Sequence, residues 1–176
     1  MERETKIEID DFELSEPINI VGCSVHIPVA GTPECFKSIG ELYSRFFGDG
    51  ILEKIPNKKE LVIKKDQNHF GICHNHIAKG DKIEFTYTIG IQINQSLNDN
   101  ELLKIFQKLT IPKGDYARIH VSAPSENAIG SAWVEFDKWI KKFPEWDFHE
   151  TVYEVYLDNT SGWMEFEMWK QILKKK

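Results

Sequence analysis

The chain has 176 residues, of which 41% are hydrophobic and 28% charged, as is usual for a globular protein with a sizeable core. Its net charge of −6 argues against the positive surface that non-specific binding to nucleic acid or to an anionic membrane requires. Aromatic residues make up 12%, including 5 Trp and 11 Phe, and this richness favours an aromatic-lined cavity.

Targeting signals and disulfide patterns are absent from the sequence. The N-terminal stretch MERETKIEIDD is charged and lacks the apolar segment of a signal peptide, and no apolar run approaches the length of a membrane span. Cys23, Cys35 and Cys73 are odd in number and widely spaced, which favours reduced thiols. We therefore expect a cytoplasmic protein with no membrane partner.

The first predicted elements are extended segments followed by a helix. Residues 6–29 are expected to be extended, with Pro17 interrupting them and INIVGCSVHI as the stronger strand. A helix is predicted to begin after Thr32 as N-cap, with Pro33 in its first turn, and to end at Gly48. The apolar side of this helix is expected to comprise Phe36, Ile39, Tyr43, Phe46 and Phe47.

Three further strands complete the first half. LVIKK (61–65) and HFGICHNH (69–76) are predicted strands, and residues 75–82 form a predicted turn. IEFTYTIGIQI (83–93) alternates strictly between apolar and polar positions, as a half-buried strand does. One side of it comprises Phe85, Tyr87, Ile89 and Ile91.

After a seam near residues 96–100, the same order of elements recurs. The predicted elements are two extended segments, a helix, a loop and two closing strands, at residues 102–112, 115–123, 125–143, 144–150, 151–157 and 163–173. The apolar side of the second helix comprises Ile129, Ala132, Trp133, Phe136, Ile140 and Phe143.

Together these elements predict an α+β fold in a single domain that covers residues 1–176. Two pseudo-symmetric β-α-β-β units, at about residues 6–96 and 100–173, would form an antiparallel sheet with both helices on one face. Several candidates for the uncovered face are large aromatic residues. A ligand groove is therefore expected on that other face.

The strand at 151–157 contains a carboxylate where one is costly. Val152, Glu154 and Tyr156 should point to one side of this aromatic strand, and an unpaired charge buried there is unfavourable. A ligand site would explain the glutamate. A buried salt bridge, or a position at the sheet edge that reaches water, are the structural alternatives.

Five segments carry a resemblance to a known family. They are FTYTIGIQI (85–93), IPKGDYARIHV (111–121), AIGSAW (128–133), YEVY (153–156) and EMWKQI (167–172). In this order, and over about residues 6–173, the sequence resembles the GyrI-like, or AraC-type effector-binding, small-molecule-binding domains. The resemblance implies a ligand cavity between two pseudo-symmetric halves.

The resemblance also implies a role for the unusual carboxylate. In multidrug-sensing transcription regulators with this domain, a glutamate of the Glu-x-Tyr strand faces the cavity and attracts lipophilic cations, and Glu154 matches it. Tyr87 and Tyr116 match positions near the cavity. The sequence shows no helix-turn-helix segment of the kind that precedes the domain in many relatives, so direct binding to nucleic acid is not expected.

Alternation in the closing strand adds further candidates. Met164, Phe166 and Met168 are expected to face the core under the helices, which leaves Glu167 and Trp169 toward the groove. The predicted ligand-binding residues are Glu154, Tyr87, Tyr116, Trp133, Trp169, Tyr43, Phe47 and Glu167. Packing in the core is the alternative for the aromatic residues, and a solvated strand face is the alternative for Glu167 and Trp169.

No cofactor or metal is expected. His74 and His76 are two residues apart and could point the same way, but no third ligand accompanies them. We expect the histidines of this segment, including His69, to be exposed.

Three functions are consistent with these residues. The leading hypothesis is a cytoplasmic protein that binds a lipophilic small molecule, cationic or aromatic, with Glu154 as its counter-charge. The second is an enzyme similar to the stand-alone family members that hydrolyse cyclopropanoid toxins, with Glu154 as general base and Tyr87 polarising a carbonyl. The third is a protein-interaction module of the gyrase-inhibitor type. A homodimer could form through the edge strands of the sheet.

Overall fold

The computed structural model describes residues 5–55, 67–93, 106–125, 127–157 and 163–175. The strands are β1 (Lys6–Leu14), β2 (Ile18–Ile27), β3 (Gln67–Lys79), β4 (Lys82–Gln92), β5 (Gln107–Ile111), β6 (Gly114–Ala123), β7 (Trp146–Leu157) and β8 (Met164–Lys175). The helical elements are α1 (Pro33–Tyr43), a π-helical turn η1 (Ser44–Gly48), a short 3₁₀ turn η2 (Leu52–Lys54) and α3 (Ala128–Ile140).

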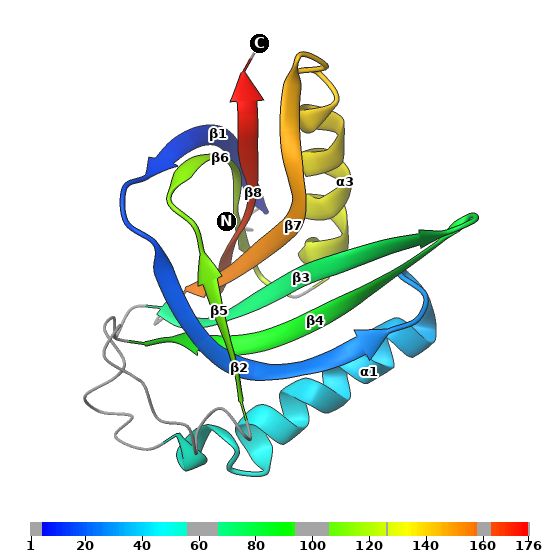
Figure 1. Ribbon diagram of the computed structural model, residues 1–176, viewed down its shortest axis with the longest axis vertical. Coiled ribbons are helices and arrows are strands. Elements are labelled where there is room, and N and C mark those ends of the chain that lie inside the picture. The colour runs from blue at the N-terminus through cyan, green and yellow to red at the C-terminus, as the bar shows by residue number, and fades with distance from the viewer. Residues whose placement is uncertain (1–4, 56–66, 94–105, 126, 158–162, 176) are drawn as a thin grey trace.

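The eight strands form one antiparallel sheet in the order β1-β6-β8-β7-β3-β4-β2-β5 (Figure 1). Three neighbouring strands come from each half of the chain, β6-β8-β7 from the second and β3-β4-β2 from the first, and β7 pairs with β3 at the centre. The outermost strands are exchanged: β1 pairs with β6 along its whole length, and β5 pairs with β2. Each half therefore supplies an edge strand to the other half.

These observations confirm the predicted α+β fold class, with an antiparallel sheet and a β-α-β-β order that occurs twice. The exchange of the edge strands is not evident from the sequence, because strand pairing between distant segments leaves no local pattern. The predicted strand at 61–65 and the predicted seam near residues 96–100 lie outside the described residues.

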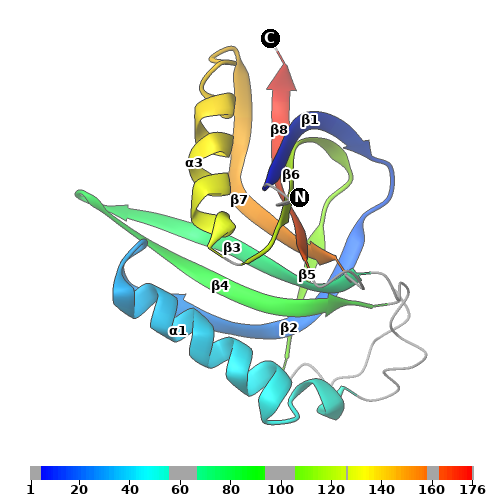
Figure 2. The same ribbon diagram turned by 180° about the vertical axis from the view of Figure 1, so that it is seen from behind.

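Both helices lie on one face of the sheet. In Figure 2, α1 runs along β2 and β4; α3 lies beside β7 and also contacts β6 and β1. Their buried residues join alternate residues of the strands in one hydrophobic core, which includes Leu42, Phe46, Tyr87, Ala132, Phe136, Phe166 and Met168. A second, smaller core on the opposite face comprises Ile18, Ile20, Phe70, Ile72, Ile111, Tyr116, Tyr153, Val155 and Trp169.

The start of α1 agrees with the sequence. The Oγ1 atom of Thr32 accepts a hydrogen bond from the backbone N–H of Cys35 at 3.2 Å, and Pro33 occupies the first turn. The helical run continues through η1 to Gly48, the predicted end.

The buried side of this helical run differs from the prediction at two positions, Phe36 and Phe47, of which the latter is 40% exposed. Cys35, Leu42 and Phe46 are buried, whereas Phe36 is 66% exposed. The spacing of Cys35 and Leu42 fits a helical stripe that excludes Phe36. Phe46 lies one helical turn beyond Leu42, so it continues the same stripe into η1.

Two strands are longer than predicted. β7 begins at Trp146, within the segment 144–150 that the sequence suggests is a loop, and its register with β8 shifts between Phe148 and Val152. β3 extends to Lys79, and the hairpin to β4 turns at Gly80, whose φ of 65° suits glycine. Register shifts of this kind interrupt alternation and hide a strand from pattern analysis.

Among the described helices, none is long and apolar enough to cross a membrane.

Candidate functional site

Glu154 lies at the centre of the sheet, on β7, between its neighbours β3 and β8. It is opposite Gly71 of β3 on one side and Met168 of β8 on the other. Only 6% of Glu154 is exposed, and its side chain points to the helix-bearing face, as do those of Val152 and Tyr156. The position at a sheet edge is therefore excluded.

Three neutral donors surround the carboxylate of Glu154. The hydroxyl of Tyr87 on β4 donates to Oε2 at 2.8 Å, and that of Tyr156 donates to the same oxygen at 3.2 Å. The indole Nε1–H of Trp133 on α3 donates to Oε1 at 3.3 Å. Among the described residues, no basic side chain contributes to the electrostatic environment of Glu154. The structure thus shows no salt bridge to this buried carboxylate within those residues.

Burial dominates the electrostatics of Glu154. It raises the pKa of the carboxyl above the ordinary value of 4.5, while the hydrogen bonds from Tyr87, Tyr156 and Trp133 lower it by less. The carboxylate also raises the pKa of Tyr87 beyond the effect of burial, so this phenol stays protonated and remains a donor. A positive charge close to the ionised carboxylate of Glu154 would therefore lower its electrostatic energy.

A second layer of aromatic residues lies around the tyrosines. The hydroxyl of Tyr43, at the end of α1, is 3.1 Å from that of Tyr87 and 3.2 Å from Nε2 of His69. The ring of His69 stacks on Tyr156 with centroids 4.4 Å apart and planes 10° apart, and Phe47 lies 5.2 Å from His69. Aromatic rings from α1, β3, β4 and β7 therefore enclose one side of the carboxylate.

Gly71 makes room for this arrangement. A Cβ atom at Gly71 would lie 2.1 Å from the Tyr87 hydroxyl oxygen and 2.6 Å from Oε2 of Glu154. No side chain fits there, so the hydrogen bond between Tyr87 and Glu154 passes directly over the backbone of β3.

The structure divides the predicted ligand residues between the two faces of the sheet. Glu154, Tyr87, Trp133, Tyr43 and Phe47 gather on the helix-bearing face. The other three, Tyr116, Trp169 and Glu167, belong to the opposite face, where the sequence placed the groove.

On that opposite face the aromatic residues pack together. Tyr116 is fully buried, donates to the carbonyl of Pro112 at 2.6 Å and stacks on Phe12. Trp169 contacts Phe12 edge-on and donates from Nε1 to Oε2 of Glu167 at 2.7 Å. Tyr116 is part of the second core, as its packing alternative proposed, and Trp169 is buried there too, which excludes a solvated strand face for it.

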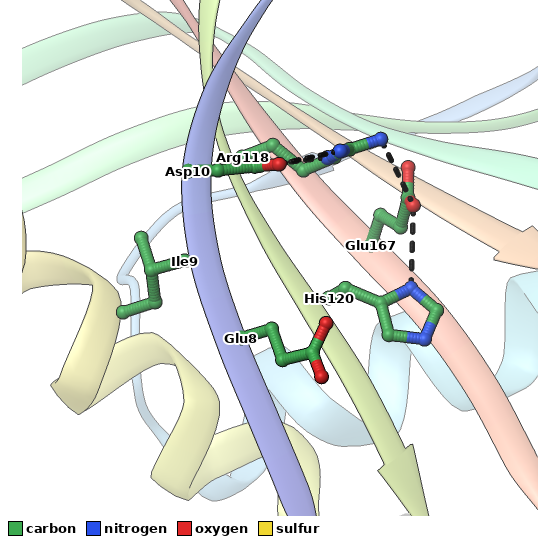
Figure 3. A pocket seen from close by; sticks show the side chains of 6 residues that line it. All are labelled: Glu8, Ile9, Asp10, Arg118, His120 and Glu167. Carbon is green, nitrogen blue, oxygen red and sulfur yellow. Dashed lines mark hydrogen bonds and ion pairs between the residues drawn. The ribbon is translucent and has the colours of Figure 1, made fainter.

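Glu167 belongs to a chain of alternating charges (Figure 3). Arg118 donates to both carboxylate oxygens of Asp10, at 2.9 and 2.6 Å, and lies 3.5 Å from Glu167. His120 has Nδ1 3.2 Å from Glu167 and Nε2 3.0 Å from Glu165. Because ionised carboxylates only accept hydrogen bonds, this geometry requires both ring nitrogens to carry protons, and the hydrogen bond to Glu167 raises the pKa of His120.

These charges line a groove of about 410 Å³ whose lining includes no Phe, Tyr or Trp side chain. Its lining residues are Glu8, Ile9, Asp10, Arg118, His120 and Glu167. Burial alone would raise the pKa of Glu167, but hydrogen bonds from His120 and Trp169, together with the charge of Arg118, lower it. The negative charge of Glu167 is thus already balanced, unlike that of Glu154.

Three residues of the helix-side site have no role in the sequence prediction. They are Tyr156, His69 and Gly71, and only 8% of His69 is exposed, contrary to the expectation that it faces solvent. Alternation along β7 places Tyr156 beside Glu154, and this signal is present in the sequence. His69 and Gly71 share a side of β3, but their proximity to Glu154 depends on the pairing of β3 with β7. Within the described residues, no group of three or more His, Cys, Asp or Glu side chains is arranged to hold a metal ion.

The fold is shared with several solved structures. SAV2435 bound to tetraphenylphosphonium has a TM-score of 0.70 at 16% identity, with 94% of this chain and 93% of that chain covered. An integron cassette protein from the mobile metagenome of Vibrio cholerae has a TM-score of 0.63 at 18% identity, covering 97% and 99% of the two chains. The C-terminal domain of EcmrR has a TM-score of 0.60 at 11% identity, covering 97% and 98%.

The architecture is therefore the GyrI-like one, which defines this chain as an α+β domain of the effector-binding class. The family model described as integron-associated effector binding protein (Cass2) matches residues 13–170, and the chain belongs to this family. A comparison with curated proteins finds no match.

Replacing Gly71 by Ala should disturb the site. The added methyl would displace the Tyr87 hydroxyl or the Glu154 carboxylate, and we expect a loss of about 1–3 kcal/mol in the free energy of unfolding, measured by urea denaturation. Tyr87→Phe removes the nearest atom, so Gly71→Ala should cost less in a Tyr87→Phe background than in the wild type. Gly40→Ala, at an exposed helix position with nothing within 4 Å, is the control and should not destabilise. Equal stability of Gly71→Ala and wild type would contradict the packing described.

The raised pKa of Glu154 should make stability depend on pH. Below the ordinary value of 4.5 the carboxyl is protonated in both the folded and the unfolded state, so burial of a charge costs nothing. As the pH rises, the folded state retains its proton longer, and stability falls until the pH exceeds the folded pKa. The free energy of unfolding of wild type minus that of Glu154→Gln should therefore decrease as the pH rises above the ordinary value, by at most about 1.4 kcal/mol per unit, and level off once the pH exceeds the folded pKa. A difference that increases with pH would show that the folded protein stabilises the charged form.

Proposed function

We propose that this protein binds lipophilic aromatic cations at Glu154, on the helix-bearing face of the sheet. The observation that carries the proposal is a carboxylate buried among aromatic rings, whose partners within the described residues are neutral donors. Burying such a charge is unfavourable unless something compensates it, and a delocalised cation supplies the missing positive charge. Its flat rings can also contact the faces of Tyr and Trp side chains.

The differences in burial support an entry path between the two helices. Tyr87 and Glu154 are held by central strands and are 2% and 6% exposed, whereas Tyr43 and Trp133 are only partly buried and Phe47 is 40% exposed. These three more accessible residues come from the helical elements. Movement of their side chains between α1 and α3 would open the site and leave the carboxylate fixed on the sheet.

The known structures give independent support. SAV2435, which shares the fold, was solved bound to tetraphenylphosphonium, a lipophilic aromatic cation. In the present chain, such a molecule would meet a carboxylate that accepts three hydrogen bonds. It would also meet four aromatic side chains, those of Tyr43, Tyr87, Trp133 and Tyr156. Binding would replace neither a salt bridge nor a metal among the described residues.

Tetraphenylphosphonium binding should depend on Glu154. We expect saturable quenching of tryptophan fluorescence in the wild type and a Kd roughly tenfold to a hundredfold higher for Glu154→Gln, because a charged contact contributes about 1–3 kcal/mol. Glu167→Gln is the matched control, since it removes a carboxylate from the opposite face, and its Kd should equal that of wild type. Weakened binding in Glu167→Gln with unchanged binding in Glu154→Gln would place the ligand in the groove of Figure 3 and contradict the proposal.

A hydrolase is the second candidate, favoured by the 2.8 Å hydrogen bond between Tyr87 and Glu154 and by the raised pKa of Glu154. A carboxyl with a raised pKa is a better general base once ionised, and the phenol could polarise a substrate carbonyl. Incubation with a cyclopropanoid electrophile separates the two functions. Consumption beyond one equivalent, abolished in Glu154→Gln, would show turnover, and consumption of no more than one equivalent would reject the enzyme.

A further inference from the structure

Within the described residues, His69 has a buried hydrogen-bonding atom without a partner. Its ring lies between Tyr156, on which it stacks, and the edges of Tyr43 and Phe47. Nε2 is 3.2 Å from the Tyr43 hydroxyl, but Nδ1 is buried and has no hydrogen-bond partner in the part of the chain that the structure describes. An unsatisfied buried polar atom is unfavourable and calls for an explanation.

The hydrogen bonds of the site determine what Nδ1 can do. A phenol has one proton, and Tyr87 uses its proton to donate to Glu154, whose ionised carboxylate can only accept. In the contact between the two phenols, Tyr43 must therefore be the donor and Tyr87 the acceptor. Having used its own proton, Tyr43 must accept from His69, so Nε2 carries the hydrogen.

This order fixes the tautomer of His69 whenever Glu154 is ionised. A neutral imidazole has one N–H, so Nδ1 is left as a bare acceptor. Burial lowers the pKa of His69 to about 4, which keeps the ring uncharged at neutral pH. A cation near Glu154 therefore meets no repulsion from this histidine.

We propose that Nδ1 of His69 accepts a hydrogen bond from the bound ligand, and that the site consequently prefers cations carrying N–H groups over fully alkylated ones. This inference rests on the proposed binding of cations at Glu154 and specifies their chemical class. The charge is recognised by Glu154, and the N–H group by His69. The hydrogen-bonded series His69–Tyr43–Tyr87–Glu154 connects these two groups. When Glu154 is ionised, this series leaves Nδ1 without a proton and therefore able to accept a hydrogen bond.

The test uses two rhodamine methyl esters with the same delocalised charge. One carries two unsubstituted amino groups, and the other, tetramethylrhodamine methyl ester, has no N–H. Fluorescence anisotropy with the full chain gives the two Kd values. The quantity compared is the Kd of the tetramethyl compound divided by the Kd of the amino compound. We expect this ratio to be about tenfold larger in wild type than in His69→Phe, a variant that retains the stacked ring but lacks the acceptor. Comparing ratios between proteins cancels the difference in size between the probes.

His69→Gln serves as the second variant, because its amide oxygen is an acceptor, and it should recover part of the preference. Nitrogen NMR supplies a separate readout: the resonances of His69 should show the Nε2–H tautomer, and Nδ1 should shift with the amino probe only. Equal ratios in wild type and His69→Phe, or an Nδ1 that already carries a proton in the free protein at neutral pH, would overturn the inference.

The outcomes also distinguish this inference from the proposed function. Suppose that both probes bind more weakly to Glu154→Gln, but that substitution of His69 leaves the ratio of their Kd values unchanged. This result would support the cation site and reject the role of His69. Failure of both probes to bind the wild type would overturn the two together.

Discussion

A carboxylate buried without a charged partner among the described residues is the constraint around which this structure is organised. Glu154 needs hydrogen bonds to offset its burial, and it accepts them from a strand on each half of the sheet and from α3. Neutral donors reduce the cost of burial without cancelling the charge. The carboxylate can therefore be buried while its charge stays uncompensated among the described residues, a combination that a salt bridge would abolish.

The sheet topology places this carboxylate at the junction of the two halves. β7 and β3 pair at the centre, so Glu154 faces Gly71 across the junction, and α1 and α3 approach it from the two sides. Exchange of β1 and β5 ties the halves together at the edges. A ligand between α1 and α3 would contact both halves, whereas the central strands would keep Glu154 in place.

Local pattern was sufficient for much of the fold and for part of the site. Alternation correctly placed Val152 and Tyr156 on the side of Glu154, and helical spacing placed Trp133 on the inner side of α3. Alternation cannot say which face of the sheet the helices cover, so Trp169 and Tyr116 were grouped with Glu154 although they lie on the other face. Gly71 and His69 depend on the register between β3 and β7, a long-range property with no signal in either strand alone.

Glu154 and Glu167 illustrate why the pairing of a residue matters more than its sequence context. Each is a glutamate in a strand rich in aromatic residues, and each accepts a hydrogen bond from a tryptophan. Glu167 also meets Arg118 and a protonated His120, and its pKa is lowered. Glu154 meets phenols and an indole, and its pKa is raised. A cation arriving at Glu167 would displace charges that already balance it, whereas one arriving at Glu154 would meet a charge with no counterpart among the described residues. The chemistry of the neighbours therefore selects the helix-bearing face as the place where a cation gains most.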